Sequence, residues 1–128
     1  MAIYLLDTSV IIDALNQKRD RWQLLAALVE AGDTLACSVV TLTEIYAGIR
    51  PKEITHTERF LDGFEHYTLD SHLARSAGLL KSEWAKKGRT LGVVNLIIAA
   101  TAITHQLVLM TDNRKDFPMS ELAHYPLP

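Results

Sequence analysis

Short apolar runs alternate with helical segments along this chain, and that alternation limits the fold more than any other feature. The runs Ala2–Leu6, Thr34–Val40 and Leu107–Thr111 are rich in apolar or β-branched residues and are too short for buried helices. Segments in which apolar residues recur at helical spacing separate them. Strands joined through helices form a parallel sheet covered on both faces. We therefore expect an α/β fold, a three-layer α/β/α sandwich with a central parallel sheet, in which residues 1–128 form a single domain.

Helices are expected where capping residues precede apolar residues at helical spacing. Asp70 is a suitable cap for the longest helix, and Thr41 and Glu44 have the spacing of a capping box, as do Thr55 and Glu58. The helix expected at residues 92–105 is apolar on nearly every face and should lie deep in the interior. The other helices are expected at residues 10–15, 21–31, 41–49, 55–64 and 71–87, and two further short strands at 67–69 and 125–127.

Composition and charge narrow the classes of protein that this chain could be. Hydrophobic residues make up 48% and charged residues 22%, which is ordinary for a globular domain. The formal charge of −2 is not that of a general nucleic-acid binder, so metal ions or local basic side chains would have to offset acidic groups. The single cysteine, Cys37, lies in an apolar run and is expected to be a buried structural thiol. No signal peptide or membrane-spanning stretch is visible, so we expect a cytoplasmic protein with no membrane contact.

Acidic and amide side chains follow the expected strands, at the edge of a parallel sheet where ligands bind. Asp7 follows the first strand, Glu44 lies in the helix after the second, and Asn95 lies near the start of the buried helix. The third strand leads into Asp112 and Asp116. Clustered carboxylates repel one another, and a hard divalent cation offsets that repulsion. The pattern predicts a magnesium site that activates a water and stabilises a phosphodiester displacement.

Each of these residues also has a structural interpretation, and the choice stays open for each residue taken alone. Glu44 fits the capping box with Thr41. The others could be helix caps (Asp7, Ser9, Asn95) or solvated loop residues (Asp112, Asp116). No cysteine–histidine spacing indicates zinc, and no glycine-rich phosphate loop or dinucleotide motif is present. Only the combination of these residues favours a metal site.

Four segments together resemble the motifs of a known family. They are Leu5-Leu6-Asp7-Thr8-Ser9-Val10-Ile11-Ile12, residues 38–48 with Thr43-Glu44 and Ala47-Gly48, residues 88–102, and Leu109-Met110-Thr111-Asp112-Asn113-Arg114-Lys115-Asp116-Phe117. In this order they resemble PIN-domain proteins, particularly VapC toxins, over nearly the whole chain. No single motif is decisive, but the four together are specific to that family.

The resemblance implies an activity and a set of partners. It implies the toxin of a toxin–antitoxin pair, an endoribonuclease that depends on Mg²⁺ (or Mn²⁺) and hydrolyses phosphodiester bonds of RNA. It further implies a cognate antitoxin protein, a homodimer, and contact with DNA only through the antitoxin.

The resemblance also assigns site residues. Asp7 and Glu44 fall on the first two acids of the family, and Asn95 falls where the family has its third acid. Asn113 aligns best with the fourth position. The remaining candidates are Ser9, as a supporting polar residue, and Asp112 and Asp116, either of which stands close enough to complete the site. The implied metal ligands are Asp7, Glu44, Asn95 and Asp116.

An asparagine at position 95 changes what such a site can do. Its amide offers one neutral oxygen, but neither a charge nor a bridging carboxylate. We expect weak magnesium binding and impaired catalysis with the fold intact, because asparagine and aspartate are nearly isosteric. An engineered inactive form and a natural variant would both carry this residue.

Two other functions compete with RNA hydrolysis. A haloacid-dehalogenase-like phosphatase would use Asp7 as its nucleophile, but it carries a second aspartate two residues later, where this chain has Ser9. A non-catalytic PIN-like module with a decayed metal site would bind only a protein partner, and Asn95 is consistent with it. Basic side chains near the expected site could hold RNA phosphates or be ordinary solvated surface. They are Arg50, Lys52, Lys86, Lys87, Arg89, Arg114 and Lys115.

Overall fold

The centre of the molecule is a sheet of five parallel strands, which the computed structural model describes together with the rest of residues 1–128. The strands are β1 (Ile3–Leu6), β2 (Thr34–Ser38), β3 (Glu65–Tyr67), β4 (Val108–Met110) and β5 (Ala123–His124). Their order is β3-β2-β1-β4-β5, so β1 is the central strand. Because all strands are parallel, their carboxyl ends lie along one edge. The predicted α/β fold with a central parallel sheet is confirmed.

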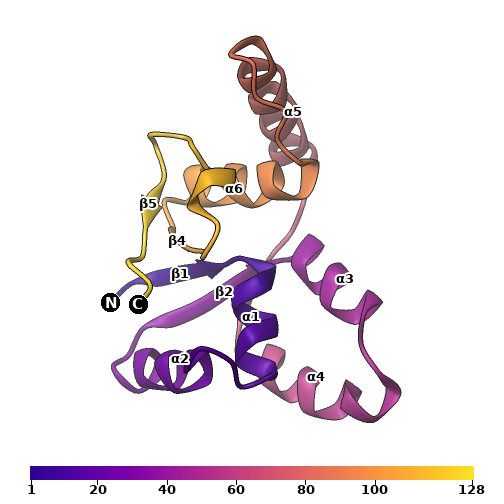
Figure 1. Cartoon of the computed structure of the whole chain (residues 1–128), viewed down its shortest axis with the longest axis vertical. Coiled ribbons are helices and arrows are strands. Elements are labelled where there is room, and N and C mark those ends of the chain that lie inside the picture. The colour runs from indigo at the N-terminus through magenta and orange to yellow at the C-terminus, as the bar shows by residue number, and fades with distance from the viewer.

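Helices cover both faces of this sheet. They are α1 (Thr8–Leu15), α2 (Arg21–Glu30), α3 (Val39–Ala47), α4 (Ile54–Asp62), α5 (Ser71–Lys86) and α6 (Val93–His105), with 3₁₀ turns η1 (Pro51–Glu53) and η2 (Arg114–Asp116). Neighbouring residues of a strand point to opposite faces. Leu5 and Leu109 accordingly belong to a core with α5 and α6, whereas Leu6 and Met110 belong to a core with α1, α2 and α4. Figure 1 shows the two sets of helices on opposite sides of the strands.

The two helices on the α6 face differ in how deeply they are buried. Every residue from Leu96 to Ala102 in α6 is buried, which confirms the prediction of an interior helix. Helix α5 packs against α6 and extends away from the sheet (Figure 1). Only Leu73 and Ala77 of α5 are buried, and Leu79 is 58% exposed. The far side of α5 is therefore exposed to solvent.

The start of α3 differs from the prediction. The helix begins at Val39, and the hydroxyl of Ser38 accepts a hydrogen bond from the backbone N–H of Val40 at 3.3 Å. Thr41 lies inside the helix, so the predicted capping box between Thr41 and Glu44 is wrong. Val39 and Val40 are β-branched, a residue type that favours strands. For that reason the strand expected from the sequence ran two residues into what is the start of α3.

Other element ends were predicted with mixed success. Asp70 caps α5 as predicted, since its carboxylate accepts a hydrogen bond from Leu73 N at 2.8 Å. The capping box predicted at Thr55 is wrong, because α4 begins at Ile54 directly after η1. Strand β5 lies two residues earlier than predicted, because Pro126 has no N–H with which to continue the ladder. Strand β3, predicted at residues 67–69, also lies two residues earlier, paired with β2.

Two further features bear on function. Cys37 is fully buried, and that burial raises the pKa of its thiol to about 12, so the thiol is inert and structural as predicted. None of the helices combines the length and the apolarity that a membrane span needs.

Candidate active site

Asp7 lies at the end of the central strand and is held there by backbone and side-chain contacts. Its N–H donates to Met110 O of β4 at 2.9 Å, and its side chain is 6% exposed. One carboxylate oxygen accepts a hydrogen bond from Thr8 N at 2.8 Å, and the other accepts one from the Thr111 hydroxyl at 2.8 Å. Asp7 is therefore the N-cap residue of α1 and also a buried carboxylate at the carboxyl edge of the sheet. The two interpretations of this residue are compatible.

The surroundings of Asp7 raise its pKa. Burial is the largest cause, and the hydrogen bonds from Thr111 and Thr8 act against it. The charge of Glu44 raises the pKa further, and a hydrogen bond from Ser9, at 3.5 Å, lowers it. The ionised carboxylate thus lacks a compensating positive charge, which a bound cation would supply.

Glu44 is linked to Asp7 through Thr8. The Thr8 hydroxyl donates to the Glu44 carboxylate at 2.7 Å, and it lies 3.2 Å from the Thr41 hydroxyl. The backbone N–H of the same Thr8 binds Asp7. Glu44 is exposed on α3, so its carboxylate is accessible from solvent. Sequence reasoning found both acids but not the hydroxyls of Thr8, Thr41 and Thr111, whose partners lie far away in the sequence.

The loop after β4 contributes Thr111 to the site. Its hydroxyl accepts a hydrogen bond from Asn113 N at 3.0 Å while it donates to Asp7. Asn113 is thus two hydrogen bonds from Asp7, although its side chain is exposed. Asp116 ends the turn η2, is half-buried and forms no ion pair. No hydrogen bond joins Asp116 to Asp7, and the choice between Asn113 and Asp116 stays a prediction.

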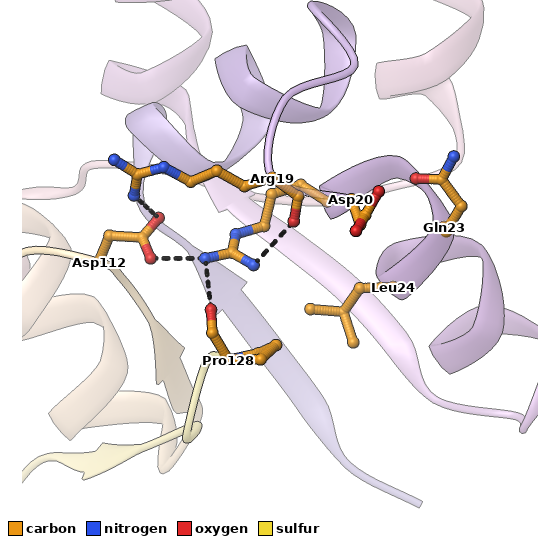
Figure 2. A pocket seen from close by; sticks show the side chains of 7 residues that line it. Arg19, Asp20, Gln23, Leu24, Asp112 and Pro128 are labelled. Atoms are coloured by element: carbon orange, nitrogen blue, oxygen red, sulfur yellow. Dashed lines mark hydrogen bonds and ion pairs between the residues drawn. The ribbon is translucent and has the colours of Figure 1, made fainter.

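Asp112, the third candidate on this loop, pairs with arginines instead. Its Oδ1 accepts a hydrogen bond from Arg21 Nη2 at 2.7 Å, and its Oδ2 lies 3.5 Å from Arg19 Nη1 (Figure 2). These residues line an open cavity of about 740 Å³ together with Asp20, Gln23, Leu24 and Pro128. The two arginines therefore offset the negative charge of the Asp112 carboxylate, whereas no basic side chain offsets the charge of Asp7.

Asn95 is the third residue of α6, and its side chain is half-buried without a hydrogen bond to the rest of the chain. The N-cap of α6 is Gly92, so the structural interpretation of Asn95 as a cap is wrong. Helix α6 leads directly into β4 and runs opposite to it. The first turn of α6 therefore lies toward the carboxyl edge of the sheet, where Asp7 and Thr111 are.

The donors at this edge suit a hard cation. Asp7, Glu44 and Asn95 offer oxygen atoms, which are the ligands that Mg²⁺ prefers. No three of the His, Cys, Asp and Glu side chains come together as a metal-binding group. The three oxygen donors match the chemistry of Mg²⁺, but only two of them are carboxylates, one fewer than the predicted site requires.

Several of the basic residues near this edge already have partners. Arg89 donates to Lys115 O at 2.6 Å, and Arg114 donates to Tyr125 O at 3.3 Å. Arg50 pairs with Glu53 at 3.2 Å. In these positions the side chains stabilise loops. Contacts of any of the basic residues with RNA remain predictions.

Comparison with known proteins identifies the family. Residues 4–123 match the model of the PIN domain. The chain is 32% identical to "Ribonuclease VapC19" of Mycobacterium tuberculosis, covering 90% of this chain and 92% of that protein. It is 30% identical to "Ribonuclease VapC2" of Rickettsia felis, covering 90% of each. The crystal structure of VapBC2 from Rickettsia felis, bound to a DNA fragment from its promoter, superposes with a TM-score of 0.81 at 28% identity and covers 96% of this chain and 97% of that one. The predicted resemblance is confirmed, and this chain belongs to the PIN-domain family, with VapC ribonucleases as its relatives.

Proposed function

We propose that this chain is the toxin of a VapBC pair, a metal-dependent endoribonuclease whose activity Asn95 impairs. The observation that supports it most is the buried, uncompensated carboxylate of Asp7, linked through Thr8 to Glu44 at the carboxyl edge of the sheet. The relatives named ribonuclease supply the reaction class. The phosphatase alternative has no support from this family.

The roles of the residues follow from their contacts. Asp7 and Glu44 would hold Mg²⁺ or Mn²⁺, with Asn95 as a neutral ligand and Asp116 or Asn113 completing the site. When bound, the ion would lower the pKa of a water and stabilise negative charge on the phosphate. Thr8 and Thr111 fix the orientation of the two carboxylates through short hydrogen bonds. Ser9 supports Asp7 from the first turn of α1.

The test is the substitution Asn95→Asp. It adds a third carboxylate, and loss of one preorganised electrostatic group commonly costs about 100- to 1000-fold in rate, so we expect a gain of at least that size. The measurement is cleavage of total cellular RNA with Mg²⁺, with chelator as a blank. Gln106→Glu, at the far end of the same helix, is the matched control and should leave cleavage unchanged.

The outcomes separate the candidate functions. Equal cleavage by the parent chain and Asn95→Asp would mean that position 95 does not contribute to the site. No cleavage by either on any RNA would favour the second candidate, a PIN-like module that only binds a partner. The observation that favours this candidate is the absence of a third carboxylate beside Asp7 and Glu44.

We further propose that an antitoxin segment binds the groove beside Glu44. The groove lies between α1, α3 and α4, and it combines apolar and acidic lining. Its lining residues are Ile12, Leu15, Asn16, Glu44, Ile45, Gly48, Ile49, Glu53 and Thr57. A basic side chain of the antitoxin would pair with the uncompensated carboxylates. DNA would be contacted only through the antitoxin, and the pair would act in the cytoplasm.

We also propose a homodimer, supported by apolar side chains exposed on α5 and at the start of α6. Leu79 is 58% exposed and Val93 is 57% exposed. A second copy could cover them. Light scattering at micromolar concentration should give twice the monomer mass for the parent chain and less for Leu79→Glu. A monomer in both cases would contradict this proposal.

A further inference from the structure

We propose that Arg21 is a positioning residue, which orients the carboxylate of Asp7 through Asp112 and Thr111. This inference rests on the proposed function for its catalytic consequence, but its structural part is testable without activity. Arg21 is the first residue of α2 and, at 1% exposure, is among the most buried side chains of the molecule. A buried guanidinium needs an explanation, because charged side chains are seldom buried unless they are paired.

The guanidinium of Arg21 joins three segments that are distant in sequence. Nη2 donates to Asp112 Oδ1 at 2.7 Å and lies 3.2 Å from Pro128 O. Nη1 donates to Arg19 O at 3.3 Å. Figure 2 shows these contacts converging between the loop before α2, the loop after β4 and the segment after β5. Arginine suits this position because its planar fork can donate to several acceptors at fixed angles.

The arrangement is costly for the fold. Gln17, Arg19 and Asp20 have φ values of 55°, 55° and 57°, a left-handed conformation that residues other than glycine rarely adopt. The Nε of Arg21 is buried without a hydrogen-bond partner. Strained backbone lowers stability, and a buried ion pair contributes little net stability in return. Backbone strain of this kind tends to occur at functional sites. Loop strain and buried charge here both serve to fix Asp112.

Fixing Asp112 also fixes Thr111 and Asn113, the residues on either side of it. The Thr111 hydroxyl donates to Asp7 at 2.8 Å and accepts from Asn113 N at 3.0 Å. Both bonds require the loop after β4 to keep its conformation. The path from Arg21 to Asp7 therefore consists of one ion pair, one peptide bond and one hydrogen bond, without any direct contact between the two residues.

Arg19 provides the matched control, because it reaches the same carboxylate from solvent. Its side chain is 62% exposed and lies 3.5 Å from Asp112 Oδ2, which has no hydrogen-bond partner. Exposed ion pairs of this kind contribute little to stability, since water screens the two charges. If the buried position of Arg21 matters more than the positive charge beside Asp112, Arg21→Met should loosen the loop after β4 far more than Arg19→Met does.

The test measures hydrogen exchange of the Asn113 backbone amide by NMR in the parent chain and its variants. We expect Arg21→Met to accelerate this exchange about tenfold or more, as loss of a charged hydrogen bond implies. Arg21→Lys should restore part of the protection, and Arg19→Met should change nothing. Leu73→Ala, a core substitution in α5, controls for general loss of stability. Exchange in Arg21→Met no faster than in an equally destabilised Leu73→Ala would overturn the inference.

A second readout connects the loop with catalysis. In an Asn95→Asp background, Arg21→Met should lower kcat about 100-fold with little change in KM, because a small displacement of a reacting group has that effect. Arg21→Lys should recover part of kcat. A rise in KM at constant kcat would assign Arg21 to substrate binding instead. If Asn95→Asp itself is inactive, the proposed function fails, while the exchange experiment still decides the role of Arg21 in the loop.

Discussion

Asp7 and Glu44, at the carboxyl edge of the sheet, have only hydroxyl and amide partners, whereas Asp112, on the loop after β4, is paired with two arginines. The pKa of Asp7 is raised by burial and by the charge of Glu44. The difference separates an acid whose charge is left free for a ligand from an acid whose charge is already used to hold the structure. An uncompensated buried carboxylate costs stability and is available to a cation, while a compensated one cannot act as a ligand without first losing its partners.

The largest expected effect on stability comes from breaking the compensated pair. Asp112→Ala leaves the buried guanidinium of Arg21 with only two backbone oxygen acceptors, those of Arg19 and Pro128. Removing one partner of a buried pair typically lowers the free energy of unfolding by about 3–5 kcal/mol, and we expect that range here. Urea denaturation followed by circular dichroism measures it. The double variant Arg21→Met/Asp112→Leu should recover most of the loss, and a loss below about 1 kcal/mol in Asp112→Ala would mean that the pair is not effectively buried.

At Asp7, whose charge is uncompensated, we expect a substitution to raise the free energy of unfolding. Asp7→Asn removes the buried charge and keeps a side-chain oxygen for Thr8 N, since asparagine and aspartate cap helices about equally well. We expect the free energy of unfolding at pH 7 to rise by about 1 kcal/mol, within the range common for stabilising changes. Cleavage in an Asn95→Asp background should be lost at the same time. A destabilised Asp7→Asn variant would mean that the Thr111 hydrogen bond outweighs the cost of burying the charge.

The difference in stability between the parent chain and Asp7→Asn should depend on pH, because the pKa of Asp7 is raised. A group whose pKa is higher in the folded state stabilises the fold fully below its unfolded value, near 3.8, and loses that contribution as pH rises through the folded value. The parent chain and Asp7→Asn should therefore be equally stable below about that pH and diverge above it. Parallel stability curves from acidic to neutral pH would show that Asp7 is not the group responsible.

The sequence predicted the fold because each strand and helix has a local signal, such as Asp70 before α5 or the continuous apolar residues of α6. The sequence pattern also predicted that Asp7 and Glu44 lie at one edge of the sheet, since residues that follow parallel strands share that edge. It missed the partner of Asp112, because Arg21 lies 91 residues away and no pattern links the two. It missed Thr8 and Thr111 for the same reason. Local rules place side chains on an edge, but only packing decides which of them pair.

The smallest expected effect is the one that best tests whether burial, not charge, separates these carboxylates. Arg19→Met removes a positive charge 3.5 Å from Asp112, but the arginine side chain is 62% exposed and forms no hydrogen bond with that oxygen. Methionine must adopt the same left-handed backbone, with φ at 55°, so the strain of the loop stays and only the side chain changes. Exposed ion pairs contribute about 0–1 kcal/mol, and we expect less than about 0.5 kcal/mol here by urea denaturation. Raising the salt concentration should narrow even this difference, because exposed charges are screened, whereas the effect of Asp112→Ala should persist. A loss in Arg19→Met comparable to that in Asp112→Ala would show that both arginines neutralise Asp112 equally and that burial of Arg21 has no special role.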